Sequence, residues 1–193
     1  HFCEGNWYRV ENEYVAKIEA YLDPHWTAIG LPPYQHDGES AYNEAVAAED
    51  RSIICLDRAN ISPQGQAAIE PCDLYSVQNE KALFQHVKVS TLSAKLSHLF
   101  NQGTNAIELI RLENTALENL KSLIKDRTTD DQYSELIAPL VSDLHHVCFA
   151  IITRKDAKGK SKNLPLFSRI SLMRNLKALQ VMGVTGSFGF IED

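Results

Sequence analysis

The sequence predicts an α/β fold in which helices sandwich a mixed β-sheet. Two observations carry this prediction. Segments in which apolar residues alternate, as in strands, occur between segments whose apolar residues recur at helical spacing. Their order is helix, three strands, further helices, a strand, a helix and a last strand. A doubly wound sheet would instead alternate strand and helix regularly, so we expect antiparallel and parallel strands in one sheet.

The N-terminal half supplies the first helices and three of the central strands. In the first helix Tyr14, Ile18 and Leu22 recur at helical spacing, and Asp23-Pro24 ends it. An extended segment of two prolines then leads to a second helix. The elements expected here are a strand at 7–10, helices at 13–22 and 39–50, a buried strand at 52–56, a turn at 60–66, and strands at 69–75 and 83–89.

The C-terminal half is expected to be mostly helical, with two further strands. Leu92, Leu96 and Leu99 form one apolar stripe of a helix, and Gly103 is expected to end that helix as its C-cap. The elements expected here are helices at 91–102, 105–125, 133–144 and 168–182, strands at 147–153 and 184–191, and a basic loop at 155–163.

Length and composition indicate an ordinary globular domain. The chain has 193 residues, of which 44% are hydrophobic and 23% charged, enough for one domain with a substantial core. We expect a single domain that comprises an N-terminal extension (1–36), a core (37–154) and a C-terminal helix and strand (164–193). Because the chain starts with His1 rather than Met, we interpret it as a fragment of a longer protein.

Net charge and cysteine usage further narrow the class of protein. The net charge of −6 argues against a strongly basic nucleic-acid-binding surface, although metal ions can supply the positive charge where phosphate binds. The sequence shows no apolar run of membrane-spanning length, and we expect no signal peptide. Its four cysteines are widely spaced and lack a C-x-x-C pair, so we expect reduced thiols in a cytoplasmic protein without structural zinc.

The strands at 69–75 and 83–89 carry the polar residues of greatest chemical interest. Asp73 lies on the first, and His86 and Lys88 lie on the second, where the alternation of side chains points them to the same face. Metal-dependent nucleases of the PD-(D/E)xK (restriction-endonuclease-like) type build their sites from an Asp on one strand and an x-Lys pair on its neighbour. The order α-β-β-β-α-β resembles their core, with His86 in place of the usual acid.

This resemblance implies the catalytic residues Asp73, His86 and Lys88 and a divalent metal, Mg or Mn. Phosphodiester hydrolysis uses such a cation to polarise the phosphate and activate a water, and carboxylates are its preferred ligands. Asp73 would bind the metal, with Glu39 or Glu44 from the preceding helix. The roles of Glu70 and His86 stay open. Glu70 could join if Pro71 makes the strand irregular, and His86 could act as a base, contact phosphate, or mark a site without activity.

The helix after Lys88 could contact nucleic acid. Lys95, His98 and Gln102 form one polar stripe, and Ser90 lies near the helix start, where phosphate can accept backbone hydrogen bonds. The alternative is an ordinary solvated helix edge. The basic run at 155–162 could likewise follow a nucleic-acid backbone or be a solvated loop tip.

Several motifs spread over nearly the whole chain together carry a family resemblance. They are Trp7-Tyr8, Leu31-Pro32-Pro33-Tyr34, Glu39, Tyr42-Asn43, Ile69-Glu70-Pro71-Cys72-Asp73, His86-Val87-Lys88, Leu96-Ser97-His98-Leu99-Phe100-Asn101-Gln102-Gly103 and Leu164-Pro165-Leu166-Phe167-Ser168. In these residues the chain resembles the DUF6119 family of sporadically distributed bacterial proteins. This resemblance implies the C-terminal part of a longer protein, often found among mobile defence or restriction-type genes.

The leading hypothesis from the sequence is a metal-dependent nuclease, or nuclease-like domain, that acts on DNA or RNA in antiphage defence. One alternative is a catalytically inactive nucleic-acid-binding module, whose binding would be sensitive to salt and not to chelators. Another is a protein-interaction or sensor domain of a defence complex, which the acidic net charge favours modestly. Membrane partners are not expected, and assembly with a second copy or with a defence-system partner stays open.

Overall fold

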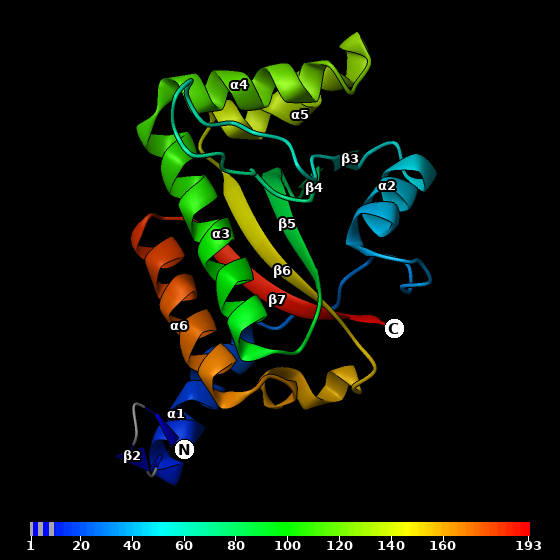
Figure 1. Cartoon of the computed structure of the whole chain (residues 1–193). Helices are drawn as coiled ribbons and strands as arrows, with labels where there is room; N and C mark the ends of the chain where they lie inside the picture. The colour runs from blue at the N-terminus through cyan, green and yellow to red at the C-terminus, as the bar shows by residue number, and fades with distance from the viewer. Residues whose placement is uncertain (1, 4–5, 8–9) are drawn as a thin grey trace.

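A five-stranded mixed sheet organises the chain, as the computed structural model of residues 2–3, 6–7 and 10–193 shows (Figure 1). The strands lie in sequence order, and each pair of neighbours is antiparallel as far as β5 and parallel beyond it. As a result, β4 alone runs against the other four. The strands are β3 (Ile54–Cys55), β4 (Leu74–Gln78), β5 (Lys81–Val89), β6 (His145–Thr153) and β7 (Thr185–Glu192).

Local sequence explains the hairpin that sets the register of β4 and β5. Asn79 and Glu80 both have positive φ, 49° and 62°, which is the backbone of a two-residue hairpin turn. Asparagine tolerates this conformation well. The turn aligns Gln78 with Lys81. This register places Asp73, the residue just before β4, beside the second half of β5.

Two long helices cover one face of the sheet. Helices α3 (Ser93–Leu112) and α6 (Leu166–Val181) lie side by side across β5, β6 and β7 in Figure 1, and α1 (Asn12–Leu22) packs against α6. The larger core fills this interface with fully buried aromatic rings, among them Phe84, Phe100 and Phe149. Helices α4 (Asn114–Lys125) and α5 (Asp130–Val141) pack together beyond the end of α3.

The opposite face is covered by helix α2 (Glu39–Glu49) and by the chain that precedes it. Two backbone hydrogen bonds guide that chain along the outer edge of β7, from Thr27 N to Phe188 O (2.9 Å) and from Tyr34 N to Glu192 O (2.7 Å). A smaller core lies under α2 and includes Tyr42 and Val87. Helices therefore flank the mixed sheet on both faces, as the sequence predicts.

Most predicted elements are present, and four differ. The strand predicted at 69–75 lies at Leu74–Gln78, and the preceding residues form a loop. The helices predicted at 91–102 and 105–125 are instead α3, which runs to Leu112, and α4. The predicted basic loop is the 3₁₀ segment Ala157–Asn163. The strand predicted at 7–10 falls partly outside the described residues.

Gly103 does not end α3 but allows it to lie close to the sheet. A Cβ atom at this position would lie 2.7 Å from Cε1 of Phe149 and 3.0 Å from Cδ2 of His86. These distances are shorter than carbon atoms normally tolerate, so only glycine permits this packing. Glycine can either end a helix or allow close packing in its interior, and the sequence of one helix does not distinguish these two roles. The prediction that Gly103 is a C-cap was wrong for this reason.

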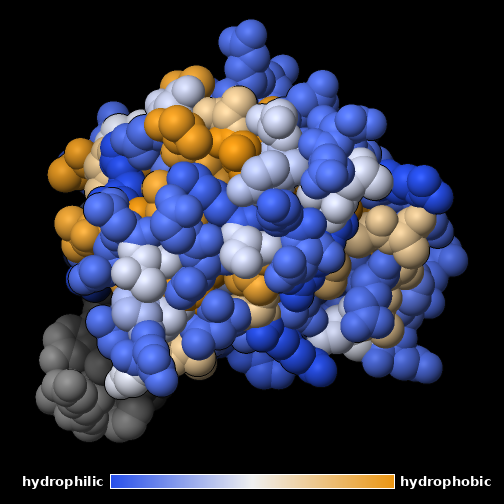
Figure 2. All heavy atoms as spheres, turned by 90° about the horizontal axis from the view of Figure 1, so that it is seen from above, coloured by the Kyte–Doolittle hydropathy of each residue, from blue (hydrophilic) through white to orange (hydrophobic). Residues whose placement is uncertain are grey.

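The surface is largely hydrophilic, with hydrophobic residues gathered toward one side of the view in Figure 2. Exposed large hydrophobic residues include Leu112, Val141 and Val181, at the ends of three helices. In the part of the chain that the structure describes, no helix is both long and apolar enough to cross a bilayer. Cys55, Cys72 and Cys148 are free thiols there, as the sequence predicts.

A candidate metal centre in an acidic cleft

A cleft of about 770 Å³ opens where β4 stops short of covering β5. Its walls come from the start of α2, the end of β5, one side of α3 and both ends of the segment that connects β3 to β4. The cleft brings together residues far apart in sequence. Its ionisable and amide side chains are Asp37, Glu39, Asp57, Arg58, Glu70, Asp73, Lys88, His98 and Gln102.

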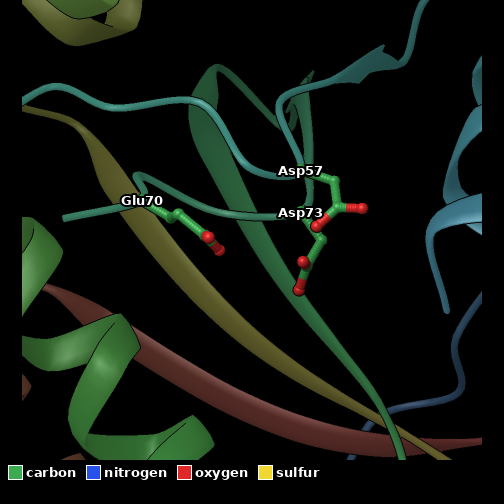
Figure 3. Close-up of side chains that lie close together, drawn as sticks. All are labelled: Asp57, Glu70 and Asp73. Carbon is green, nitrogen blue, oxygen red and sulfur yellow. The ribbon is translucent and has the colours of Figure 1, made fainter. Parts of the chain in front are cut away.

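Three carboxylates converge within this cleft. Asp57, Glu70 and Asp73 each offer an oxygen that lies within 4.8 Å of the other two. Figure 3 shows Asp57 and Asp73 next to each other and Glu70 to one side of them, and all three lie on the segment that connects β3 to β4. The backbone holds the two ends of this segment together, because Leu56 N donates to Asp73 O (2.8 Å) and Ile61 N to Ile69 O (3.0 Å). All their ligand atoms are oxygens, the donor set that Mg²⁺ and Mn²⁺ favour.

Asp73 is the most constrained of the three. Its Oδ2 accepts a hydrogen bond of 2.6 Å from Val87 N on β5. Burial raises the pKa of Asp73 to about 7, and the negative charges of Asp57, Glu70 and Glu39 act in the same direction, while the hydrogen bond from Val87 opposes them. Nearby carboxylates that repel one another need either protons or a cation, so this pKa fits a cation-binding role.

Lys88 and Glu39 form an ion pair beside this cluster. The Nζ atom of Lys88 lies 2.6 Å from Oε2 of Glu39, and both side chains are roughly 30% exposed. The other oxygen of Glu39, Oε1, accepts from Val89 N at 2.8 Å. Asp73 and Glu39 therefore each bind a backbone N–H along the edge of β5 that β4 leaves uncovered.

Two further hydrogen bonds fix the remaining carboxylates. Gln102 on α3 donates through Nε2 to Oε2 of Glu70 at 2.9 Å. Ser40, in the first turn of α2, donates its hydroxyl to Asp57. Asp57, Glu70 and Asp73 thus each accept a hydrogen bond from another element of the fold. In each carboxylate this bond involves one oxygen and not the other.

The structure places the predicted residues unequally. Five of them line the cleft: Asp73 just before β4, Lys88 on β5, Glu39 on α2, and His98 and Gln102 on α3. Glu44, Ser90 and Lys95 do not line it: Glu44 and Lys95 are exposed, and the hydroxyl of Ser90 accepts from Leu92 N at 3.1 Å.

His86 is the main correction. Its ring is fully buried under α3 beside Phe149, and neither nitrogen has a hydrogen-bond partner among the described residues. Burial lowers the pKa of His86 to about 3, so the ring is neutral. The prediction that His86 shares the cleft with Lys88 was wrong, because the close approach of α3 at Gly103 covers His86 and leaves Lys88 clear.

Asp57 is the cleft residue that the sequence argument did not single out. It lies two residues after the short strand β3, and a carboxylate near the end of a strand is a usable signal of a sheet-edge site. Glu70 was an open alternative that required an irregular chain around Pro71. The structure provides that irregularity, because residues 66–73 form no regular strand.

Comparison with known protein families identifies the chain's relatives. Residues 1–192 match the family described as "Family of unknown function (DUF6119)". The chain belongs to the DUF6119 family. No curated protein and no solved structure matches it. The cleft of this DUF6119 member must therefore be interpreted from its own geometry.

The protonation of Asp73 predicts a pH effect on stability. Its folded pKa lies above the usual value of 3.8, so between about pH 4 and pH 7 the folded state binds more protons than the unfolded state. Without divalent cation, we expect the stabilising contribution of Asp73 to be largest below pH 4 and lost as pH rises through 7. Buried histidines with lowered pKa values, such as His86, act in the opposite direction below about pH 6.5.

Urea unfolding of wild type and Asp73→Asn isolates this contribution. The free energy of unfolding of the wild type, relative to the variant, should fall by on the order of 1 kcal/mol or more between pH 5 and pH 8, since one pKa unit corresponds to about 1.4 kcal/mol. The histidines are common to both proteins and cancel. A relative stability that is constant or rises over this range would contradict the assigned pKa.

Proposed function

We propose that this chain hydrolyses phosphodiester bonds in DNA or RNA, with a divalent cation, Mg²⁺ or Mn²⁺, held by Asp57, Glu70 and Asp73. The observation that carries the proposal is the convergence of these three carboxylates in a cleft that Lys88 also lines, at the edge of β5 that β4 leaves uncovered. Carboxylates and a lysine in one cleft are the groups that such a reaction needs.

The arrangement of elements supports this proposal. A helix leads into three strands, of which the middle one is antiparallel to both neighbours, and the helices α3, α4 and α5 lead to a fourth strand that is parallel to the third. Apart from the additional helices α4 and α5, PD-(D/E)xK nucleases share this order, and they place an Asp near the second strand and the Lys on the third. Asp73 and Lys88 occupy these positions, and Glu39 lies at the start of the first helix of the series.

The chain departs from the nuclease pattern at His86, and the segment that connects β3 to β4 carries other acidic residues nearby. Where those enzymes carry an acid two residues before the lysine, this chain carries the buried His86. We propose that Asp57 and Glu70 supply the missing negative charge from the loops that flank β3 and β4. The number of carboxylates around Asp73 is thereby maintained although their origin in the chain differs.

Each group has a distinct role in the proposed reaction. When bound, the cation would polarise a phosphate oxygen and lower the pKa of an attacking water. Asp73, held by Val87 N, and Glu70, held by Gln102, keep their carboxylates in fixed positions. Lys88 offers a positive charge to the phosphate as negative charge builds up there. Glu39 holds the Lys88 ammonium at the cleft wall until the substrate competes for it.

The same charges disfavour binding of nucleic acid without a metal. Five acidic side chains line the cleft against two cationic ones, Arg58 and Lys88, and the negative excess would repel phosphate. A cation bound among the carboxylates would offset this repulsion. The resemblance to proteins found among mobile defence genes supports antiphage defence as the setting of the activity.

Cleavage of plasmid DNA and of a labelled RNA tests the proposal. With Mg²⁺ or Mn²⁺ we expect wild type to cleave at least one of the two, and EDTA to stop the reaction. Lys88→Met should lower the rate by about 10²-fold or more, the effect of removing one donor to a developing charge. Lys95→Met, which removes an exposed lysine outside the cleft, serves as the matched control.

Two results would refute the assignment. The first is an absence of cleavage of either nucleic acid under all cation conditions. The second is equal loss of activity in the Lys88 and Lys95 variants, which would indicate a general effect of surface charge instead of a role in the cleft.

A further inference from the structure

The face of the sheet that carries α2 is divided into an apolar half and a polar half. Under α2 the strands present residues such as Leu74 and Val87 to the smaller core. Toward the start of β5 and β6, the same face presents polar side chains instead. These are Ser76, Gln85, His146, Cys148 and Ser187. Because side chains alternate along each strand, all five lie on the same face of the sheet as Leu74 and Val87. Buried strand faces are usually apolar, so this polar half calls for an explanation.

A cavity of about 330 Å³ lies over the polar half. The strands form its floor, the chain at 27–31 forms one wall, and the turn after α2 forms another. Its volume is at the lower end of the roughly 300–1,000 Å³ typical of small-molecule sites. Among the described residues, none that lines this cavity also lines the acidic cleft.

Two buried polar atoms in the cavity lack partners. Ser76 is 2% exposed and Gln85 is 5% exposed, and neither Oγ of Ser76 nor Oε1 of Gln85 has a hydrogen-bond partner among the described residues. Both residues line the cavity. Buried polar groups are normally satisfied, because leaving them unpaired destabilises the fold. A ligand that bonds to them would account for their retention.

A third polar side chain of the cavity lining, that of His146, is oriented by hydrogen bonds. His146 lies between two hydroxyls, with Nδ1 2.8 Å from Oγ1 of Thr185 and Nε2 2.7 Å from Oγ of Ser187. Burial, with a smaller effect of the Lys81 charge, lowers the pKa of His146 to about 4 and keeps the ring neutral. The Cys148 thiol also stays protonated, because burial raises its pKa to about 11.

The charges of the lining indicate an uncharged ligand. Asp50 and Lys81 are of opposite sign, and both have partners within the protein. Oδ1 of Asp50 accepts from N and Oγ of Ser52 (2.9 and 2.7 Å), and Nζ of Lys81 lies 3.3 Å from Oγ1 of Thr185. The described lining contains no arginine that could bind a phosphate. Ile53 and Leu83 add apolar surface beside the polar groups.

We propose that this cavity binds an uncharged nucleobase, either free or as a nucleoside. A base combines apolar faces with an edge of donors and acceptors, and proteins recognise it with apolar side chains against the faces and hydrogen bonds to the edge. The side-chain amide of glutamine, which both donates and accepts, suits such an edge. Gln85 and Ser76 would pair with the base, and Ile53 and Leu83 would contact its faces.

Calorimetric titration with adenosine, guanosine, cytidine and uridine tests this site, with ribose as the control ligand. We expect at least one nucleoside to bind at least tenfold more tightly than ribose. Gln85→Met and Ser76→Ala should each weaken that binding by about tenfold, as expected for loss of a hydrogen bond worth about 1.4 kcal/mol. Asp73→Asn, which changes the acidic cleft, should leave it unchanged.

The same variants distinguish a binding role from a structural one. Because the replaced oxygens have no partner in the free protein, Gln85→Met and Ser76→Ala should keep or raise the thermal melting temperature while they weaken binding. Binding of no nucleoside above the level of ribose would overturn the proposal. So would nucleoside binding that both variants leave unchanged, or that Asp73→Asn abolishes.

Discussion

Replacing Asp73 with asparagine is expected to abolish cation-dependent cleavage of nucleic acid, with a loss of at least about 10²-fold in rate. Asparagine keeps an oxygen that can accept from Val87 N, so the loop should retain its position on β5. It removes the central negative charge and a ligand oxygen from the cluster of Asp57, Glu70 and Asp73. Cleavage rates, together with calorimetric titration of Mn²⁺, measure both losses.

Glu44→Gln is the matched control for this experiment. It removes one carboxylate from the same part of the fold, but Glu44 is exposed and lies outside the cleft. We expect its cleavage rate and Mn²⁺ affinity to equal those of the wild type. If Asp73→Asn binds Mn²⁺ as tightly as the wild type does, the metal centre is not where we place it. If Glu44→Gln loses activity, the sequence-based choice of Glu44 as a ligand was better than the structural one.

Replacing Gly103 with alanine is expected to destabilise the fold by about 1–3 kcal/mol, the usual effect of overpacking a core. Helix propensity alone predicts the opposite sign, because alanine in a helix interior is favoured over glycine by roughly 1 kcal/mol. The added Cβ would lie 2.7 Å from Phe149, which is fully buried and has no free space to move into. Urea unfolding therefore decides between the two effects by the sign of the change.

Gly30→Ala provides the comparison, since a Cβ there meets no atom within 4 Å and the site has no positive φ. It should cause no loss of stability. A Gly103→Ala variant that is more stable than wild type would show that α3 can move away from the sheet at little cost. Because His98 and Gln102 lie on the same helix, such a movement would also change one wall of the acidic cleft.

The sequence predicted the sheet and its helices well where periodicity was strong. β6 contains the unbroken apolar run 147–152, and α2 begins at Glu39 as expected. The strand around Asp73 was predicted too early because Ile69 and Cys72 are apolar. Their burial comes from packing and from loop hydrogen bonds, which leave no periodic signature in the sequence.

The candidate site was predictable where strand pairing determines it and not along the rest of the loop. Lys88 lies on β5 as predicted, and the pairing of β4 with β5 brings Asp73, the residue just before β4, beside β5. Asp57 and Glu70 reach the site through the conformation of residues 57–70, which only the folded chain determines. His86 was misplaced because alternation gives the face of the sheet that a residue occupies, whereas the helix that covers this face is set by Gly103, a contact distant in sequence.

The two backbone contacts on β5 affect how this site can evolve. Val87 and Val89 position Asp73 and Glu39 through their N–H groups, which every residue except proline possesses. The side chains at positions 87 and 89 are therefore free to drift, within the limits of packing, without loss of the contacts that orient the two acids. Part of the site is thus specified by the path of the main chain, and homologues can retain it after the local sequence has become unrecognisable.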